Sequence, residues 1–339
     1  MDDRYSRQIL FSPVGTKGQE KLLSSRVLIA GCGALGSSHS EMLARAGVGK
    51  LRIVDRDFVE FSNLQRQTLF SESDAENRLP KAVAAKNRIA EVNPSINVEA
   101  SVADINASNI ESFVKDCDVV IDGSDNFQLR YLVNDACVKH SIPWVYGAAV
   151  SSYGSTMTII PNETPCLRCV FEEMPDAGSS PTCDTAGVIM PIISTISAIQ
   201  VSEAIKLLVD DKGSRHQTLM QIDVWTNERH AIKLGEPNPD CPACAQNTFE
   251  FLDVANGASS AVLCGRDAVQ ISPSRPTEID LALLAARIQS AGEVKHNEYL
   301  VRFFSGENEV TVFRDGRAII KGTDDISVGR SIYARFVGA

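Results

Sequence analysis

The chain has 339 residues, of which 44% are hydrophobic and 22% are charged, the composition of an ordinary soluble globular protein. This length suits one large α/β core with a smaller appended domain. The formal net charge is −10, whereas proteins that bind nucleic acid usually carry a basic surplus. The composition therefore argues against a nucleic-acid partner.

Two segments bear on cellular location. Residues 1–5 contain no apolar run, so we expect no signal peptide. Residues 186–201 form the longest apolar stretch, but they include Pro191 and several hydroxyl side chains. We interpret this stretch as a buried helix, too short and too polar to span a bilayer. A cytoplasmic protein without a membrane partner is expected.

The first 146 residues alternate between short apolar runs and stretches of helical periodicity. The strands are expected at residues 26–30, 51–54, 96–102, 119–121 and 144–146. The helices are expected at residues 16–24, 35–46, 80–92, 106–115 and 125–140, with a long polar loop at 56–77. Strands that alternate with helices predict an α/β fold with a doubly wound, Rossmann-like and mostly parallel sheet.

After residue 146 the pattern changes. Residues 154–160 and 218–224 are predicted strands without short helices between them, which favours a mixed or antiparallel extension of the sheet. The end of the chain has its own set of elements: strands at 268–271, 299–304, 309–313 and 317–321, a helix at 277–290 and a final helix. We therefore predict a large domain at 1–245, a linker at 246–260 and a small α+β domain at 261–339.

A glycine-rich turn follows the first strand. Gly31, Gly33 and Gly36 fit the pattern G-x-G-x-x-G, in which glycines permit a tight turn and the next helix offers free N–H groups to phosphate. Asp55 ends the following strand, at the spacing of a carboxylate that hydrogen-bonds ribose hydroxyls. These residues alone leave a redox dinucleotide site and an ATP site equally open.

Three charged residues further along the chain favour ATP. Arg66 and Lys81 are placed to reach the crevice at the strand ends, and nucleotidyl transfer depends on positive charge at the phosphates. Asp125 follows the strand at 119–121, a position suited to Mg²⁺ held by one carboxylate and by ATP oxygens. Each residue alone has an ordinary explanation as a solvated Arg, a surface Lys or an N-cap Asp. Their combination beside a glycine turn is harder to dismiss.

Five of the nine cysteines have notable positions. Cys166, Cys169, Cys241 and Cys244 form two C-x₂-C pairs, which together predict a tetrahedral structural zinc site. A redox disulfide or four unrelated buried thiols are the alternatives. Cys183 is unpaired and precedes a predicted helix near residue 187, where a thiol with a lowered pKa is a nucleophile. The alternative for Cys183 is a loop cysteine without a role.

These motifs together resemble the ThiF/MoeB/HesA family, the prokaryotic relatives of ubiquitin-activating enzymes. The resemblance extends from Arg4 to Cys244. The matching segments are residues 4–8, 31–36, 46–49, 62–67, 80–81 and 124–126, together with both cysteine pairs. One departure is Ala34, where many members have a second glycine.

The resemblance implies a homodimer that adenylates the C-terminal Gly of a ubiquitin-like sulfur carrier ending in Gly-Gly. ATP and Mg²⁺ are then required, Zn²⁺ occupies the cysteine pairs, and the activated carrier serves thiamine or molybdopterin biosynthesis. Ribose binding is carried over to Asp55 and the magnesium role to Asp125. Arg7 matches an arginine inserted into the partner's active site, and Cys183 a cysteine that can link covalently to the carrier. The remaining nucleotide-binding positions are Gly31, Gly33, Ala34, Gly36, Asp57, Asn63, Arg66 and Lys81.

Two other functions remain as alternatives. An NAD-dependent dehydrogenase explains the glycines and Asp55, but leaves the cations and the cysteine pairs without a purpose. A non-catalytic binder of a ubiquitin-like protein would retain only the fold, and the intact set of Arg7, Arg66, Lys81 and Asp125 argues against it. For the small C-terminal domain, carrier docking, subunit packing and recruitment of a downstream enzyme are all compatible with the sequence.

Overall fold

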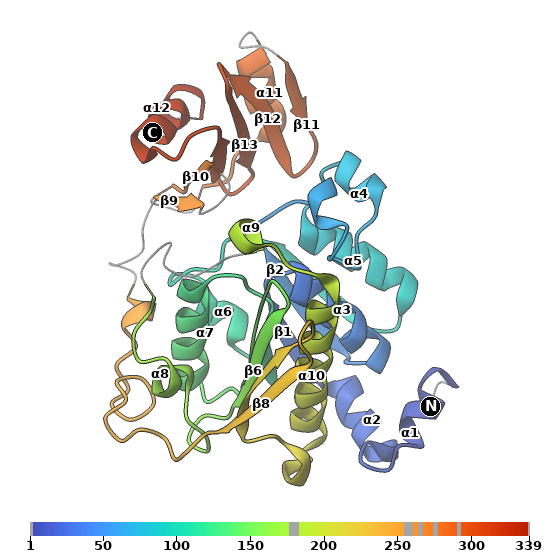
Figure 1. The fold of residues 1–339 in the computed structure, drawn as a ribbon. Coiled ribbons are helices and arrows are strands. Elements are labelled where there is room, and N and C mark those ends of the chain that lie inside the picture. Colours follow the sequence, from blue (N-terminus) through green and yellow to red (C-terminus); the bar gives the residue numbers. More distant parts are fainter. Residues whose placement is uncertain are drawn as a thin grey trace. The chain divides into compact units, whose positions relative to one another are not determined.

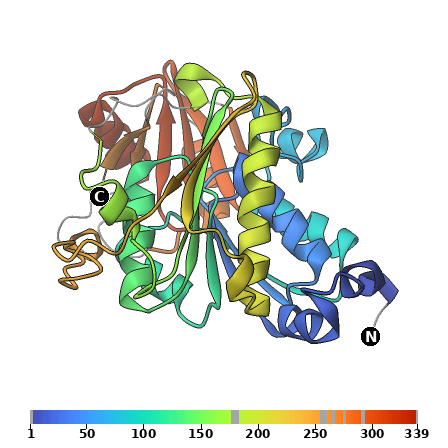
Figure 2. The ribbon, with the colours of Figure 1, turned by 60° about the horizontal axis from the view of Figure 1, so that its bottom comes forward.

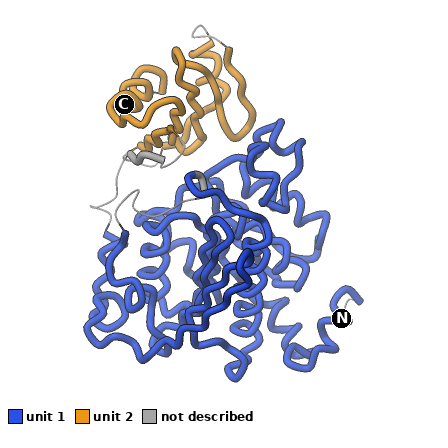
Figure 3. The backbone as a smooth tube through the Cα atoms, in the orientation of Figure 1, with its two compact units in different colours: residues 1–255 blue, residues 256–339 orange. Residues whose placement is uncertain are grey.

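The computed structural model describes residues 3–175, 183–253, 260–263, 267–273, 277–289 and 293–337. The chain divides into two compact units, Met1–Ala255 and Asn256–Ala339 (Figure 3). An eight-stranded sheet forms the centre of the first unit, and a six-stranded sheet forms the centre of the second.

The large sheet has the strand order β3-β2-β1-β4-β5-β6-β7-β8. Figure 1 labels β1, β2, β6 and β8 of this sheet. Its first five strands are parallel, whereas β6, β7 and β8 each run antiparallel to the preceding strand. The prediction of a doubly wound sheet with a mixed extension is thus confirmed. The strands are β1 (Arg26–Ala30), β2 (Lys50–Asp55), β3 (Asn97–Val102), β4 (Val119–Asp122), β5 (Trp144–Val150), β6 (Tyr153–Ile159), β7 (Thr218–Asp223) and β8 (Glu228–Lys233).

The strand order reverses at β1. From β1 the chain first adds β2 and β3 on one side and then places β4 and β5 on the other. In open parallel sheets, ligands bind at the carboxyl ends of the two strands that flank such a reversal. The turn after β1 and the turn after β4 are therefore the expected walls of a ligand site.

Helices cover both faces of this sheet. Because side chains alternate along a strand, Val27 and Ile29 of β1 pack in one apolar cluster and Leu28 and Ala30 in another. The first cluster contains residues of α2 (Gly15–Ser24), α3 (Ala34–Ala46), α5 (Lys81–Val92) and α10 (Met190–Val209). The second contains residues of α6 (Ile110–Val114) and α7 (Phe127–Lys139). Figure 2 shows α10 lying along one face. Burial on both faces explains why the parallel strands are almost continuously apolar.

The helical segments of the first unit vary widely in length. They are η1 (Asp3–Tyr5), α1 (Ser6–Ile9), α2 (Gly15–Ser24), α3 (Ala34–Ala46), η2 (Phe61–Asn63), α4 (Glu72–Glu76), α5 (Lys81–Val92), α6 (Ile110–Val114), α7 (Phe127–Lys139), α8 (Leu167–Val170), α9 (Cys183–Ala186), α10 (Met190–Val209), η3 (Lys212–Ser214) and η4 (Glu250–Leu252).

Helix α10 corrects one expectation. It has 20 residues and a mean hydropathy of 1.6 over its most apolar window, so by length and composition it could cross a membrane. The expectation of a stretch too short and too polar for a bilayer is wrong, because the helix continues to Val209. Half of this most apolar 18-residue stretch of α10 is buried, and Ile192, Ile196 and Ala204 are fully buried. The predicted buried helix is confirmed.

Two other boundaries differ from the sequence expectation for local reasons. Helix α7 begins at Phe127 rather than at Asp125, because the Asn126 side chain accepts the N–H of Leu129 (2.8 Å) and caps the helix. The expected loop at 56–77 contains η2 and α4. Ser71 and Asp74 form a reciprocal capping box that begins α4.

In its described residues, the second unit is an antiparallel sheet with two helices. Its strand order is β11-β12-β13-β14-β10-β9. Residues of α11 and α12 pack with alternate residues of the strands, such as Val301 and Phe303 of β12, in one apolar cluster. The elements are β9 (Ser260–Leu263), β10 (Ala268–Ile271), α11 (Leu281–Ile288), β11 (Val294–His296), β12 (Leu300–Ser305), β13 (Asn308–Phe313), β14 (Ala318–Lys321) and α12 (Ile326–Phe336).

Candidate active site

The glycines of the turn between β1 and α3 have different surroundings. Gly31 has a φ of +92°, in the left-handed region that favours glycine. A Cβ atom on Gly36 would lie 1.9 Å from the carbonyl oxygen of Gly31, so the turn can close only if residue 36 is glycine. A Cβ atom on Gly33 would meet only the carbonyl oxygen of Gly123, at 4.0 Å. The N-terminal end of α3 is therefore open at Gly33, as a phosphate site requires.

Asp55, the last residue of β2, forms a hydrogen bond with the backbone of this turn. It is 8% exposed, and its carboxylate accepts the N–H of Cys32 and the N–H of Asp57, each at 2.6 Å. Burial raises the pKa of Asp55, although the nearby Lys81 ammonium opposes this shift. The carboxylate predicted to bind ribose thus also fixes the backbone of the glycine turn.

Lys81 brings positive charge to the same place. It is the first residue of α5 and is 4% exposed. Its Nζ atom lies 3.3 Å from Oδ2 of Asp57, and its backbone N–H donates to the carbonyl of Asp57 at 2.9 Å. Through the contacts of Cys32 and Asp57 with Asp55, and of Lys81 with Asp57, the structure brings the glycine turn, Asp55, Asp57 and Lys81 together.

Arg56 is a member of this group that the sequence analysis did not identify. Its Nη1 atom lies 3.0 Å from Oδ1 of Asp104, and its Nε atom 3.9 Å from Oδ1 of Asp57. Burial would lower the pKa of Arg56, but the carboxylates of Asp104, Asp57 and Asp125 outweigh burial and raise it. The available signal was its position directly after the strand-ending Asp55.

Asn63 and Arg66 lie in the segment between β2 and α5. The Asn63 side chain is buried and accepts the N–H of Glu60 at 3.0 Å. The Arg66 guanidinium donates to the carbonyl of Ser62 at 2.9 Å. Both side chains form these hydrogen bonds inside their own segment, so contacts of theirs with a nucleotide remain a prediction.

Asp125 lies in the turn between β4 and α7, at the other wall of the strand reversal, and is exposed. Burial would lower the pKa of Arg56 and of Arg130, but neighbouring carboxylates, Asp125 among them, raise both. The Asp125 carboxylate therefore acts on two guanidinium groups at the carboxyl ends of the strands. This location agrees with the predicted crevice.

A buried ion pair lies on either side of Asp125 in the chain, between Asp122 and Arg130. The sequence did not lead us to expect it. Arg130 of α7 and Asp122 at the end of β4 are 5% and 1% exposed, and Nε of Arg130 lies 3.1 Å from Oδ2 of Asp122. Gln200 of α10 also reaches this point, donating from Nε2 to the carbonyls of Asp122 (3.0 Å) and Val145 (3.2 Å). An aspartate at the end of a buried strand was the available signal.

Arg7 is not part of this group within one chain. It is exposed in α1, whose neighbour Gln8 donates to the carbonyl of Ala46 at 2.9 Å. Ala46 is the last residue of α3, a helix of 13 residues that begins at the glycine turn. Such a helix spans about 20 Å at 1.5 Å per residue. Arg7 therefore lies beside the end of α3 that is remote from its own glycine turn.

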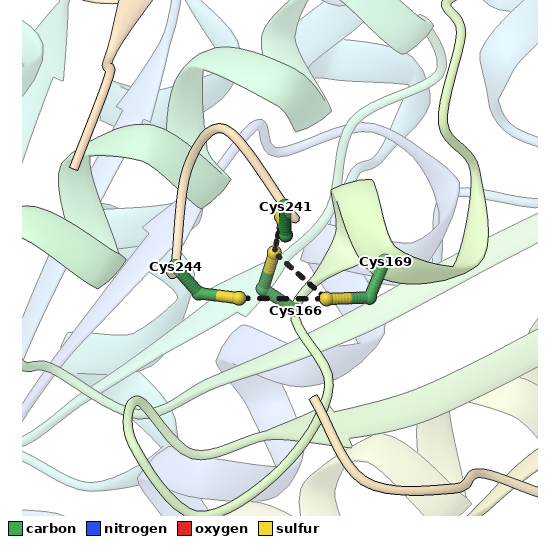
Figure 4. Close-up of side chains that lie close together, drawn as sticks. All are labelled: Cys166, Cys169, Cys241 and Cys244. Carbon is green, nitrogen blue, oxygen red and sulfur yellow. Dashed lines mark hydrogen bonds between the residues drawn. The ribbon is translucent and has the colours of Figure 1, made fainter. Parts of the chain in front are cut away.

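The four paired cysteines converge on one point (Figure 4). Their Sγ atoms all lie within 4.8 Å of one another, with distances of 3.9 Å from Cys166 to Cys169, 3.6 Å from Cys166 to Cys241 and 3.4 Å from Cys169 to Cys244. In a tetrahedral zinc site with Zn–S bonds of about 2.3 Å, sulfur atoms are separated by about 3.8 Å. The donor set and its spacing fit Zn²⁺.

Helix α7 and η4 surround this cluster. The Asn134 side chain accepts the N–H of Leu167 at 2.9 Å, and Asp135 accepts the N–H of Phe251 at 3.2 Å. Arg168 pairs with Glu250 at 2.6 Å. These contacts hold η4 in the first unit, within the stretch predicted as a linker at 246–260. Residues 254–259 of that stretch lie outside the described residues.

Cys183 is the first residue of α9. Its side chain and residues 176–182 before it lie outside the described part of the chain. The nucleophile predicted at Cys183 therefore rests on the sequence.

Comparisons with known proteins agree with this geometry. A model of the ThiF family matches residues 5–243. The chain is 45% identical to the sulfur carrier protein ThiS adenylyltransferase of Bacillus subtilis over the full length of both proteins. It is 41% identical to the SAMP-activating enzyme E1 of Haloferax volcanii, covering 74% of this chain and 92% of that enzyme.

A solved structure supports the fold. The crystal structure of E. coli MccB with ATP superposes with a TM-score of 0.63 at 24% sequence identity, covering 72% of this chain and 75% of that one. The fold and site define a Rossmann-like nucleotide-binding protein with a cysteine cluster. The chain belongs to the ThiF family.

Proposed function

We propose that this chain is an adenylyltransferase that activates the C-terminal Gly of a ubiquitin-like sulfur carrier ending in Gly-Gly. The activated carrier then accepts sulfur for thiamine or molybdopterin biosynthesis. The relative from Bacillus subtilis supports this proposal, since it matches the chain from end to end. The structural observation that carries it is the gathering of the open Gly33 backbone, Asp55, Lys81 and Asp125 at one strand reversal.

In the proposed reaction a carboxylate oxygen of the carrier attacks the α-phosphorus of ATP. A new O–P bond forms, the bond to the bridging oxygen of pyrophosphate breaks, and the products are the acyl-adenylate and pyrophosphate. The reaction needs no oxidant or reductant. An NAD-dependent dehydrogenase would have no use for a buried lysine and the exposed Asp125 beside the nucleotide, so adenylation accounts better for the residues present.

Each residue near the crevice receives a role in this proposal. The N–H groups at Gly33 and Ala34 face phosphate, Gly31 and Gly36 allow the turn to close, and Asp55 binds ribose. Lys81, Arg66 and Asn63 contact the phosphates, for which Lys81 must exchange its contact with Asp57. Mg²⁺, when bound at Asp125, neutralises charge on the phosphate oxygens. The positive charge of Arg56 offsets the negative charges of the Asp57 and Asp104 carboxylates.

The proposal includes a homodimer in which Arg7 acts in trans. An arginine supplied by a second subunit can stabilise the charge that develops on transferring phosphate. The exposure of Arg7 and its place beside the far end of α3 support delivery to a neighbouring chain.

We also propose Zn²⁺ on Cys166, Cys169, Cys241 and Cys244, and a cytoplasmic location, where reducing conditions keep these thiols available. Cys183 is proposed as the residue that can link covalently to the carrier. The second unit is part of the full-length match, and carrier docking, subunit packing and recruitment of a downstream enzyme are the roles to test for it.

The test is ATP–pyrophosphate exchange with a candidate carrier that ends in Gly-Gly. Asp125→Asn should lower exchange at least about 100-fold, because a metal ion on the phosphates contributes several kcal/mol to the transition state. Asp116→Asn is the matched control. Asp116 is also exposed, but it precedes the amino end of β4, whereas Asp125 follows the carboxyl end of that strand. Unchanged exchange in folded Asp125→Asn protein would refute the magnesium role. NADH binding without carrier-dependent exchange would favour the dehydrogenase instead.

A further inference from the structure

The buried Asp122–Arg130 ion pair also binds backbone groups of two neighbouring segments. Nη2 of Arg130 donates to the carbonyl of Ser124 (3.0 Å) and to that of Gly147 (3.1 Å), while Nε pairs with Asp122. Two charges taken out of water cost several kcal/mol each unless good geometry and further hydrogen bonds compensate them. This pair has such compensation, and it joins the end of β4 and the middle of β5 to α7.

The residue that these charges restrain most tightly is Ser124. Oδ1 of Asp122 accepts both its N–H (2.9 Å) and its hydroxyl (2.6 Å), and Arg130 binds its carbonyl. Directly beyond Asp125, the Asn126 side chain caps α7 by accepting the N–H of Leu129. The backbone is therefore fixed on both sides of Asp125, although the Asp125 side chain is exposed.

A third element supports the same point from below. Gln200 of α10 donates to the carbonyl of Asp122, so both the carbonyl and the carboxylate of Asp122 are held. Since the Gln200 amide N–H groups are used in this way, its Oε1 accepts from Nε2 of His39 at 2.9 Å. Burial lowers the pKa of His39 to about 3, so this histidine is neutral and leaves no opposing charge beneath the pair.

We propose that the Asp122–Arg130 ion pair is a positioning device for the Asp125 carboxylate, and that it sets the affinity of this carboxylate for Mg²⁺–ATP. This inference rests on the proposed function, because it assumes the magnesium role of Asp125. Because Arg130 and Asp122 are only 5% and 1% exposed, we assign the pair no contact with substrate or metal. It acts by holding the Ser124 backbone, from which Asp125 projects.

The chemistry of arginine makes the proposal specific. A guanidinium presents several N–H donors in a rigid plane, whereas an ammonium is a single point charge on a flexible stem. Arg130→Lys keeps the positive charge beside Asp122, but it cannot reproduce the Nε bond and both Nη2 bonds together. The variant therefore separates the positioning of Ser124 from charge neutralisation.

The experiment measures ATP binding by calorimetry on the full chain at a series of Mg²⁺ concentrations, together with carrier-dependent exchange. For Arg130→Lys we expect the Mg²⁺ concentration that gives half-maximal ATP binding to rise about 10-fold or more, the usual effect of losing a residue that orients a metal ligand. The exchange rate at saturating Mg²⁺ should change much less. The matched control is Arg168→Lys, because Arg168 is also buried and also pairs with one carboxylate, that of Glu250.

If Arg130→Lys does not fold, Ser124→Ala is the second variant, because it removes only the hydroxyl bond to Asp122. A smaller shift of the Mg²⁺ requirement in the same direction would support the proposal. An unchanged Mg²⁺ requirement in either folded variant would overturn it, as would an equal shift in Arg168→Lys. The proposed function fails separately, when wild-type protein shows no carrier-dependent exchange or when Asp125→Asn exchanges normally.

Discussion

The glycines at positions 33 and 36 allow packing to be separated from ligand access. Gly36→Ala places a methyl group 1.9 Å from the backbone oxygen of Gly31, where no side chain can move aside. We expect a loss of about 2–3 kcal/mol in unfolding free energy, measured as a lower melting temperature without ligand. ATP binding should weaken with it, because the turn itself must shift.

Gly33→Ala is the matched variant, since it adds the same methyl group in open space. Its melting temperature should stay near that of wild type, whereas calorimetry should show ATP affinity reduced about tenfold or more, because the methyl group stands where phosphate approaches. Normal ATP affinity in Gly33→Ala would show that phosphate binds elsewhere.

At this scale the sequence identified residues whose neighbours in the chain reveal their role. Asp55 ends a strand at a known spacing from the glycine turn, Lys81 follows Pro80 at the start of a helix, and the structure brings the two together. Arg130 gave no such signal. It occupies an ordinary helical position, and only the fold shows that its guanidinium reaches β4 and β5 at once. Arg56 did have a signal, its position directly after Asp55, but its partner Asp104 follows a different strand and is known only from the fold.

At the scale of elements, the two C-x₂-C pairs lead to a prediction about zinc content and stability. Cys241→Ser should abolish binding of one Zn²⁺ per chain and lower the unfolding free energy by about 2–5 kcal/mol, the usual range for the loss of a native cross-link. Metal analysis and thermal melting of reduced protein provide the measurement. ATP affinity should fall much less, because no cysteine of the cluster belongs to the glycine turn.

Cys117→Ser is the control for this prediction. Cys117 is buried outside the cluster, and its Sγ atom donates to the carbonyl of Phe113, which a hydroxyl can also do. Its zinc content should equal that of wild type. Freshly purified reduced wild-type protein without zinc would rule the structural metal out.

The elements differ in how clearly the sequence pattern predicts them. Strands β1 and β4 are short apolar runs between turn residues, and they were located to within a residue. Strand β8 was missed because all six of its side chains are exposed, so it shows neither an apolar run nor alternation. It forms through its pairing with β7, an interaction that local sequence does not encode.

For the whole molecule, the proposed homodimer predicts that two inactive chains can complement each other. Each site would combine Asp125 of one chain with Arg7 of the other. When Arg7→Ala and Asp125→Ala chains are mixed in equal amounts, half of the dimers are mixed, and one of their two sites is complete. Exchange should therefore recover to about a quarter of the wild-type value, if subunits combine at random.

Each variant alone is the control and should remain inactive. Mass spectrometry of the intact complexes establishes how many mixed dimers form. If mixed dimers are abundant but exchange stays at the level of the single variants, Arg7 acts within its own chain or has no part in the reaction.

The cysteine cluster has a further consequence for how the protein is made. Its sulfur atoms come from residues 75 positions apart, and the chain between them supplies α10, β7 and β8. During synthesis on the ribosome, the glycine turn and the five parallel strands emerge long before Cys241 and Cys244. The cluster can close only after these last ligands have left the exit tunnel. Capture of the proposed Zn²⁺ would thus be timed to the completion of the first unit, after the nucleotide-binding strands have been synthesised.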